Sequence, residues 1–118
     1  MVFSHHTSDT MGNPLVATGG SLEPRVTGGA VLDALLARPQ VIAWINGHSH
    51  RNRITPHRAS DPSRSFWEIN SVSHIDAPQQ ARVIEVASNG DGTISLFTTM
   101  IDADSPLDAG HHDLSLPG

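Results

Sequence analysis

Short apolar runs alternate with polar segments along most of this chain, and their spacing predicts mixed α and β structure. The run from Val41 to Ile45 is apolar and partly β-branched, which is typical of a buried strand. Before it, apolar residues recur on a 3.6-residue period and predict a helix. Thr27 suits the N-cap position of this helix, which is expected to run to about Arg38 and to stop at Pro39. The apolar stripe consists of Val31, Leu32, Leu35 and Leu36.

Further strands are expected on both sides of this unit. A very short one starts the chain at Val2-Phe3, and a turn is predicted from Ser60 to Ser65. The segment Ser88-Asn89-Gly90-Asp91-Gly92 is a strong hairpin signal, because Asn and Gly tolerate positive φ. The remaining predicted strands are Arg51–Pro56, Phe66–Asn70, Gln80–Ala87 and Thr93–Met100.

The order of these elements predicts the fold class. A strand, a helix and a strand form a βαβ unit, most simply parallel and right-handed. Antiparallel strands follow it, so the chain is expected to be α/β and part of a larger sandwich. Residues 7–24 form a long loop rich in Thr, Ser, Gly and Pro, and residues 102–118 are expected to be a flexible tail.

Composition excludes several classes of protein. At 118 residues the chain is one domain at most, and its net charge of −5 argues against a nucleic-acid surface or an anionic membrane as partner. All seven positive charges are arginines, and they form no cluster. No stretch is apolar enough for a transmembrane segment, and no signal peptide is evident. Localisation stays open.

Histidines after two of the predicted strands carry the candidate chemistry. His48 and His50 follow the strand Val41–Ile45 in the sequence Gly-His-Ser-His, and His5-His6 follow Val2-Phe3. On extended backbone, side chains at i and i+2 point to the same side. Because the carboxyl ends of neighbouring parallel strands meet at one edge of a sheet, the two groups are expected to share a site.

A metal ion is the ligand that such a site would take. Eight histidines in 118 residues make a chance His-x-His a real alternative, but the preceding glycine, the buried strand and the second histidine pair favour a ligand set. The chain has no cysteine, so a thiolate site is excluded and the donors must be nitrogen and oxygen.

Three segments, in order, resemble the C-terminal part of the calcineurin-like metallophosphoesterase superfamily. The first two match the family's last two metal-ligand motifs, a strand-end histidine and a Gly-His-x-His. The third resembles the strand and turn that commonly follow in bacterial members. The three segments are Val2–His6, Gly47–His50 and Phe66–Ser73 with Asp76, Pro78 and Gln79. The resemblance covers roughly residues 1–100, and residues 1–101 would be the C-terminal portion of such a domain, a β-sandwich flanked by helices.

The resemblance implies a dinuclear metal-dependent phosphatase or phosphodiesterase. His5 and His48 would bind one divalent ion and His50 the other, with Mn, Fe, Zn and Ni all suitable. His6, Asn46 and His74 would lie next to the ligands or the substrate, which would be a small phosphoester.

The earlier motifs of the family are absent from this sequence. No Asp-x-His, Gly-Asp-x-x-Asp or Gly-Asn-His occurs, so the bridging aspartate and the phosphate-binding residues are missing and no catalytic set is complete. The expectation is a fragment that is inactive or nearly so by itself. The alternative is a non-catalytic metal- or partner-binding module. An exposed sheet edge and apolar face would also favour self-association.

The remaining histidines, tryptophans and aspartates are expected to be surface or core residues without a direct part in the chemistry. His57 is expected to be a solvated surface residue, and Trp44 and Trp67 to be core residues. Asp33 and Asp76 have no evident partner for acid–base chemistry. His111-His112 in the tail would bind metal only adventitiously.

Overall fold

The computed structural model describes residues 1–13, 19 and 23–104. Within these residues it contains one α-helix, one short 3-10 helix and two β-sheets. The elements are β1 (Val2–Phe3), α1 (Gly28–Leu36), β2 (Ala43–Asn46), β3 (Arg53–His57), η1 (Pro62–Arg64), β4 (Phe66–Asn70), β5 (Gln80–Ser88) and β6 (Ile94–Asp102). The α/β expectation is therefore confirmed at this level.

The larger sheet has four strands in the order β1-β2-β4-β3. β1 pairs with β2 in parallel, as the βαβ unit predicted, and β2 pairs in parallel with β4. β3 lies antiparallel to β4 at the opposite edge from β1. The carboxyl ends of β1, β2 and β4 consequently meet at the same edge of the sheet, which is the edge that receives the histidines.

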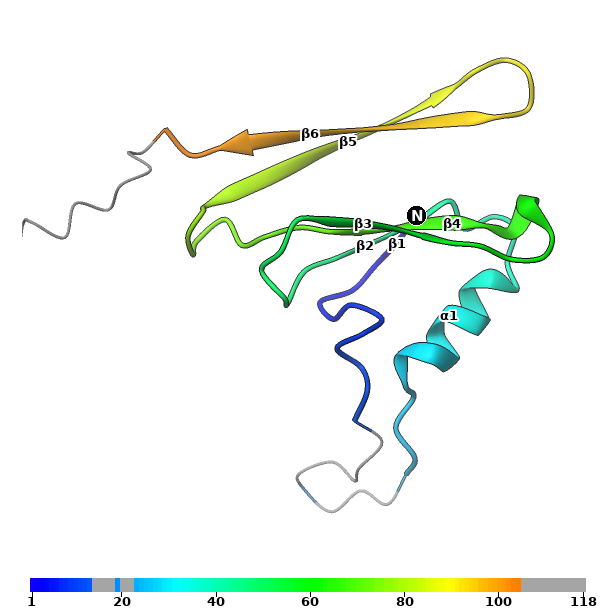
Figure 1. Ribbon diagram of the computed structural model, residues 1–118, viewed down its shortest axis with the longest axis horizontal. Coiled ribbons are helices and arrows are strands. Elements are labelled where there is room, and N and C mark those ends of the chain that lie inside the picture. The colour runs from blue at the N-terminus through cyan, green and yellow to red at the C-terminus, as the bar shows by residue number, and fades with distance from the viewer. Residues whose placement is uncertain (14–18, 20–22, 105–118) are drawn as a thin grey trace, which may run out of the picture.

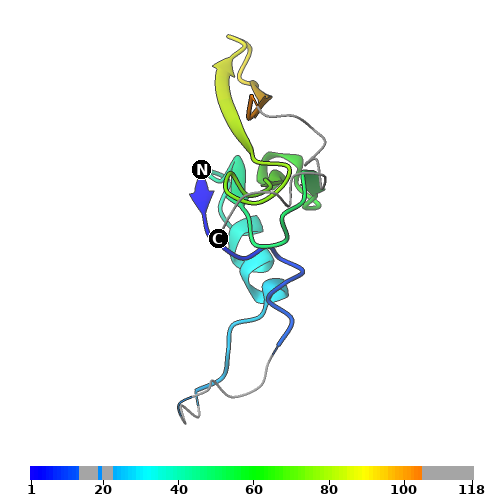
Figure 2. The same ribbon diagram turned by 90° about the vertical axis from the view of Figure 1, so that its left-hand side faces the viewer.

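The described elements form three layers (Figures 1 and 2). Helix α1 lies on one side of the four-stranded sheet, and the β5–β6 hairpin lies on the other. A space of about 390 Å³ separates the hairpin from the sheet, and its lining includes Ile54, Trp67, Leu96 and Phe97. The hairpin therefore covers the sheet loosely.

The apolar core sits between α1 and the sheet. Leu35, Val41, Trp44 and Phe66 are buried there, and Trp44 is only 1% exposed. The Trp44 indole nitrogen donates a hydrogen bond of 2.8 Å to the Ser4 hydroxyl, so its polar atom is satisfied. The prediction that Trp44 is a core residue is confirmed.

The prediction for Trp67 is wrong, because this side chain is 45% exposed. Side chains alternate between the two faces of a strand, so Trp67 in β4 points away from the core face that Phe66 shares with Glu68. It faces the space beneath the hairpin, where close packing is lacking. Ile54 and Phe97, which line the same space, are 45% and 56% exposed.

Most predicted element bounds hold to within two residues. Helix α1 begins after Thr27, whose side chain makes no capping hydrogen bond, and ends at Leu36 rather than at Arg38. β4 has the predicted bounds, and β6 extends to Asp102, one residue into the segment expected to be a tail. Residues 105–118 and most of the loop between residues 14 and 22 lie outside the described residues. No helix in the described part of the chain is long and apolar enough to cross a membrane.

Candidate functional site

The ends of β1 and β2 place the two histidine groups side by side. The ladder between these strands continues past them, because the Ser4 amide donates to the Ile45 carbonyl at 3.1 Å. The Gly47 amide then donates to the His5 carbonyl at 3.0 Å. The backbone pairing that the sequence predicted therefore places the segments that carry His5 and His48 side by side.

The imidazoles of His5 and His48 are in direct contact. His5 Nε2 lies 3.1 Å from His48 Nδ1, at hydrogen-bonding distance. The His6 ring packs against both, with ring centroids 4.1 Å from His48 and 5.1 Å from His5. His6 Nδ1 also lies 3.3 Å from the Thr10 hydroxyl. All three rings are exposed to solvent.

The Gly47–His50 segment is not extended, so the premise that placed both of its histidines on one side of a strand is wrong. β2 ends at Asn46, and both His48 (φ 64°) and His50 (φ 50°) adopt left-handed backbone conformations. The Ser49 amide donates to the Gly47 carbonyl at 2.7 Å, which closes a three-residue γ-turn around His48. Positive φ is uncommon for non-glycine residues and clusters at functional sites.

This turn sends His50 in a different direction from the one expected. His50 Nδ1 lies 3.5 Å from a carboxylate oxygen of Asp76, in the loop after β4. No acid–base partner for Asp76 was evident from the sequence, and the structure places His50 beside it. Both side chains are about half exposed.

His5 and His48 have the donor spacing that one metal ion requires. Two nitrogens about 2.0–2.1 Å from a common ion are about 3.0 Å apart at a right angle and about 3.4 Å apart in a tetrahedron. The observed 3.1 Å falls between these values. As the side chains stand, however, no group of three or more His, Cys, Asp or Glu residues among those described is arranged to hold a metal ion. The structure therefore presents a pair of donors, and further donors would have to join it.

The environment of His48 favours the neutral imidazole that metals bind. Desolvation, followed by repulsion from the charged forms of His6, His5 and His50, lowers the pKa of His48 from its usual value. A neutral ring keeps a lone pair free for coordination.

The remaining predicted residues take two different positions. Asn46 is 5% exposed at the end of β2, where its side chain belongs to a buried polar network beneath the histidines. His74 is exposed in the loop after β4.

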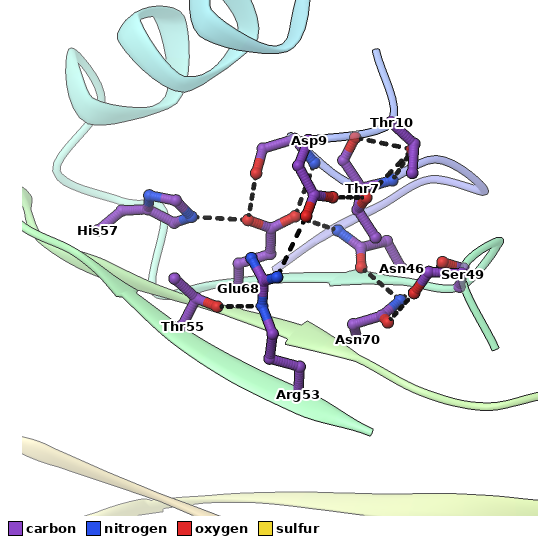
Figure 3. Close-up of polar contacts among 12 residues, drawn as sticks. Thr7, Asp9, Thr10, Asn46, Ser49, Arg53, Thr55, His57, Glu68 and Asn70 are labelled. Atoms are coloured by element: carbon purple, nitrogen blue, oxygen red, sulfur yellow. Dashed lines mark hydrogen bonds and ion pairs between the residues drawn. The ribbon is translucent and has the colours of Figure 1, made fainter. Parts of the chain in front are cut away.

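Sequence reasoning missed the centre of that network, Glu68. This residue is only 3% exposed, and its carboxylate accepts hydrogen bonds from the Ser8 amide (2.8 Å), the Ser8 hydroxyl (2.7 Å) and the Asn46 side chain (2.8 Å). His57 Nε2 lies 2.6 Å from Oε2, the carboxylate oxygen that also accepts from the Ser8 hydroxyl. Figure 3 shows this contact between His57 and Glu68. The prediction that His57 is a solvated surface residue is wrong: its side chain is 15% exposed and also packs against Phe66.

Asn70, also missed, extends the network to the His48 turn. Its side-chain amide donates to the Asn46 side chain at 3.1 Å and to the Gly47 carbonyl at 2.6 Å, and its oxygen accepts from the Ser49 hydroxyl. The sequence did hold a signal for both residues. Glu68 and Asn70 are polar residues at alternate positions of the strand Phe66–Asn70, on the face that Phe66 buries.

A polar pocket of about 250 Å³ opens beside this network. An ion pair crosses it, with Arg53 Nη1 3.1 Å from Asp9 Oδ2. A hydrogen bond from the Thr7 hydroxyl and, secondarily, the Arg53 charge lower the pKa of Asp9. The pocket lining consists of Thr7, Asp9, Thr10, Ser49, Arg51, Arg53, Thr55, Glu68 and Asn70.

Comparison with known proteins gives no relative for this chain. No family model, curated protein or solved structure matches it.

Proposed function

We propose that this chain supplies the histidine part of the metal centre of a metal-dependent phosphoester hydrolase of the calcineurin-like type. The observation that carries the proposal is the meeting of His5 Nε2 and His48 Nδ1 at 3.1 Å, from the ends of two adjacent parallel strands. The ordered resemblance of three segments to that superfamily supplies the reaction class.

His5 and His48 would hold one divalent ion through the two nitrogens that already face each other. His50 would serve a second ion, with Asp76 at 3.5 Å as the carboxylate that fixes its ring. Mn, Fe, Zn and Ni are all compatible with imidazole donors. Bound ions of this kind lower the pKa of coordinated water and stabilise charge on phosphoryl oxygens.

The protein's own residues would prepare this site. The lowered pKa of His48 keeps its ring available for coordination near neutral pH. The packing of His6 against both rings limits their rotation. The polar pocket, with the exposed Arg51 in its lining, would accept part of a small phosphoester substrate.

The donor set also limits what this chain does by itself. A dinuclear centre needs carboxylate bridges and further ligands, and this sequence lacks the motifs that supply them in the superfamily. We therefore expect metal binding with little or no phosphoester hydrolysis.

Calorimetric titration with Mn²⁺ and Ni²⁺ tests the site. The wild-type chain should bind about one ion specifically, and His5→Ala and His48→Ala should each weaken that binding at least tenfold. His74→Ala is the matched control and should leave it unchanged, because His74 is exposed and contacts neither ring. Equal binding by all four proteins would refute the site.

A phosphodiesterase and phosphatase assay with Mn²⁺ tests the expected inactivity. Robust turnover that disappears in His48→Ala would show a complete enzyme and would overturn the incomplete-site account. The alternative function is a non-catalytic metal- or partner-binding module that uses the same half of the fold. One ion bound tightly with no turnover would support that module, because the histidines of an incomplete hydrolase site should bind a divalent ion only weakly.

A further inference from the structure

Two polar residues of β4 are buried directly beneath the histidine edge of the sheet. Glu68 and Asn70 are 3% and 5% exposed, and they share the core face of the strand with Phe66. Burying polar groups is costly unless they are fully hydrogen-bonded, and no buried side-chain nitrogen or oxygen in the described residues lacks a partner. Apolar side chains would fill this face at lower cost, so the polar pair calls for a specific role.

The partners of Glu68 lie on three different segments. Ser8 follows the His5-His6 pair by two residues, Asn46 precedes Gly47 at the end of β2, and His57 ends β3. The carboxylate therefore joins the loop that carries His5 to the strand that leads to His48.

The partners of Asn70 bracket His48 itself. Its amide group donates to the Gly47 carbonyl at 2.6 Å, and its oxygen accepts from the Ser49 hydroxyl. His48, between these two residues, has a φ of 64°, which is unfavourable for a non-glycine residue. The bonds to Asn70 offset this strain and hold the turn closed. Figure 3 shows the bond between Asn70 and Ser49.

We infer that Glu68 and Asn70 are positioning residues, which hold the two histidine-bearing loops so that His5 Nε2 faces His48 Nδ1. The inference rests on the proposed function only for its effect on metal affinity, because the positioning itself concerns the contact between the two rings. The rival explanation is that the β1–β2 backbone ladder places both rings without help from β4.

Four substitutions separate these explanations. Asn70→Asp keeps the shape but loses both donated hydrogen bonds and sets a carboxylate against the Gly47 carbonyl. Ser49→Ala removes one bond and leaves the buried residues in place, so the fold is not at risk. Glu68→Ala removes every hydrogen bond that the carboxylate makes to Ser8, Asn46 and His57. Glu68→Gln can preserve these hydrogen bonds. The glutamine amide oxygen can accept from Asn46 and the Ser8 amide, while its NH₂ group can donate to the Ser8 hydroxyl and to His57 Nε2.

Nuclear Overhauser contacts between the rings of His5 and His48, measured without metal, provide the first readout. The contacts should persist in the wild type and in Glu68→Gln, weaken in Ser49→Ala, and disappear in Asn70→Asp and Glu68→Ala, while the amide spectrum of β2 and β4 keeps its dispersion. Thr55→Val is the matched control: Thr55 lines the same pocket, and its hydroxyl accepts a hydrogen bond from Arg53 Nε. Thr55→Val should leave the contacts between the rings of His5 and His48 unchanged.

Affinity for Ni²⁺, measured by calorimetry on the same proteins, provides the second readout. The Ni²⁺ affinity should fall at least tenfold in Asn70→Asp and Glu68→Ala, and in Glu68→Gln it should stay within about twofold of the wild-type value. Intact ring contacts in Ser49→Ala and Asn70→Asp would overturn the inference and favour the backbone ladder. Ring contacts that respond as expected in a chain that binds no Ni²⁺ would instead sustain the inference and refute the proposed function.

Discussion

At residue 68 a carboxylate stays ionised inside the protein because its neighbours donate hydrogen bonds to it. Burial by itself raises the pKa of Glu68, but the bonds from Ser8, His57 and Asn46 together lower it below the ordinary value of 4.5. A depressed folded-state pKa adds stability above the unfolded-state pKa. That stability is lost as the pH falls through the lower, folded-state pKa.

Glu68→Gln should therefore make stability less dependent on pH in the acid range. Urea unfolding from pH 7 down to pH 3 measures this, and the wild type should lose more stability below about pH 4.5 than the variant. Asp9, Asp61 and Asp91 also have lowered pKa values and contribute to acid unfolding in both proteins, so the difference between the two isolates Glu68. Identical pH profiles would show that folding does not lower the pKa of Glu68.

Adding a methyl group at Gly28 should lower the stability of the fold, because the backbone of Ser8 lies directly against this glycine. A Cβ atom there would lie 1.8 Å from the Ser8 carbonyl oxygen, so helix α1 and the Ser8 loop would have to separate. Gly28→Ala should destabilise the protein by more than about 2 kcal/mol, in the range of other overpacked sites. It should also disturb the link from Ser8 to Glu68.

Gly29→Ala is the matched control for this prediction. A Cβ atom at Gly29 meets nothing within 4 Å, and alanine favours helix by about 0.5–1 kcal/mol over glycine. Thermal unfolding of the two variants should shift in opposite directions. A Gly28→Ala variant as stable as the wild type would show that the loop and the helix do not pack as described.

Among the elements, those with a strong periodic pattern could be predicted from the sequence, and the turn geometry could not. The bounds of β4 and the parallel pairing of β1 with β2 follow from apolar runs and element order. The left-handed conformations of His48 and His50 do not, because they depend on hydrogen bonds to Asn70 and on neighbouring loops that are distant in sequence. Sequence therefore identified His5 and His48 as neighbours but missed what holds them and where His50 points.

The β5–β6 hairpin should open more readily than the four-stranded sheet. Its turn is local, with positive φ at Gly90 and Gly92, and the space of about 390 Å³ beneath it shows that it packs loosely on the sheet. Low packing favours local unfolding. Amide hydrogen exchange should be at least tenfold faster in β5 and β6 than in β2 and β4, and Gly92→Ala should accelerate it in the hairpin alone. Uniform protection would contradict the loose packing.

Over the whole molecule, apolar side chains remain exposed on both sides of that space. Trp67, Ile54 and Phe97 are each 45% exposed or more, and Phe3 in the edge strand β1 is 68% exposed. Exposed apolar patches and unpaired edges favour association. We propose that the chain self-associates through these faces.

Sedimentation velocity tests this proposal. The wild type should form dimers or larger species at micromolar concentration, and the double variant Trp67→Ser, Phe97→Ser should shift towards the monomer. A wild-type chain that sediments as a monomer throughout would contradict it.

The central claim is that histidines from the ends of β1 and β2 share one metal ion. Long-range ¹H–¹⁵N spectra of the imidazoles during a Zn²⁺ titration test it most directly, because they report which nitrogen of each ring binds. If the two histidines share one ion, the ¹⁵N chemical shifts of His5 Nε2 and His48 Nδ1 should change together, at one equivalent of metal. Changes confined to other histidines, with these two rings unaffected, would contradict it.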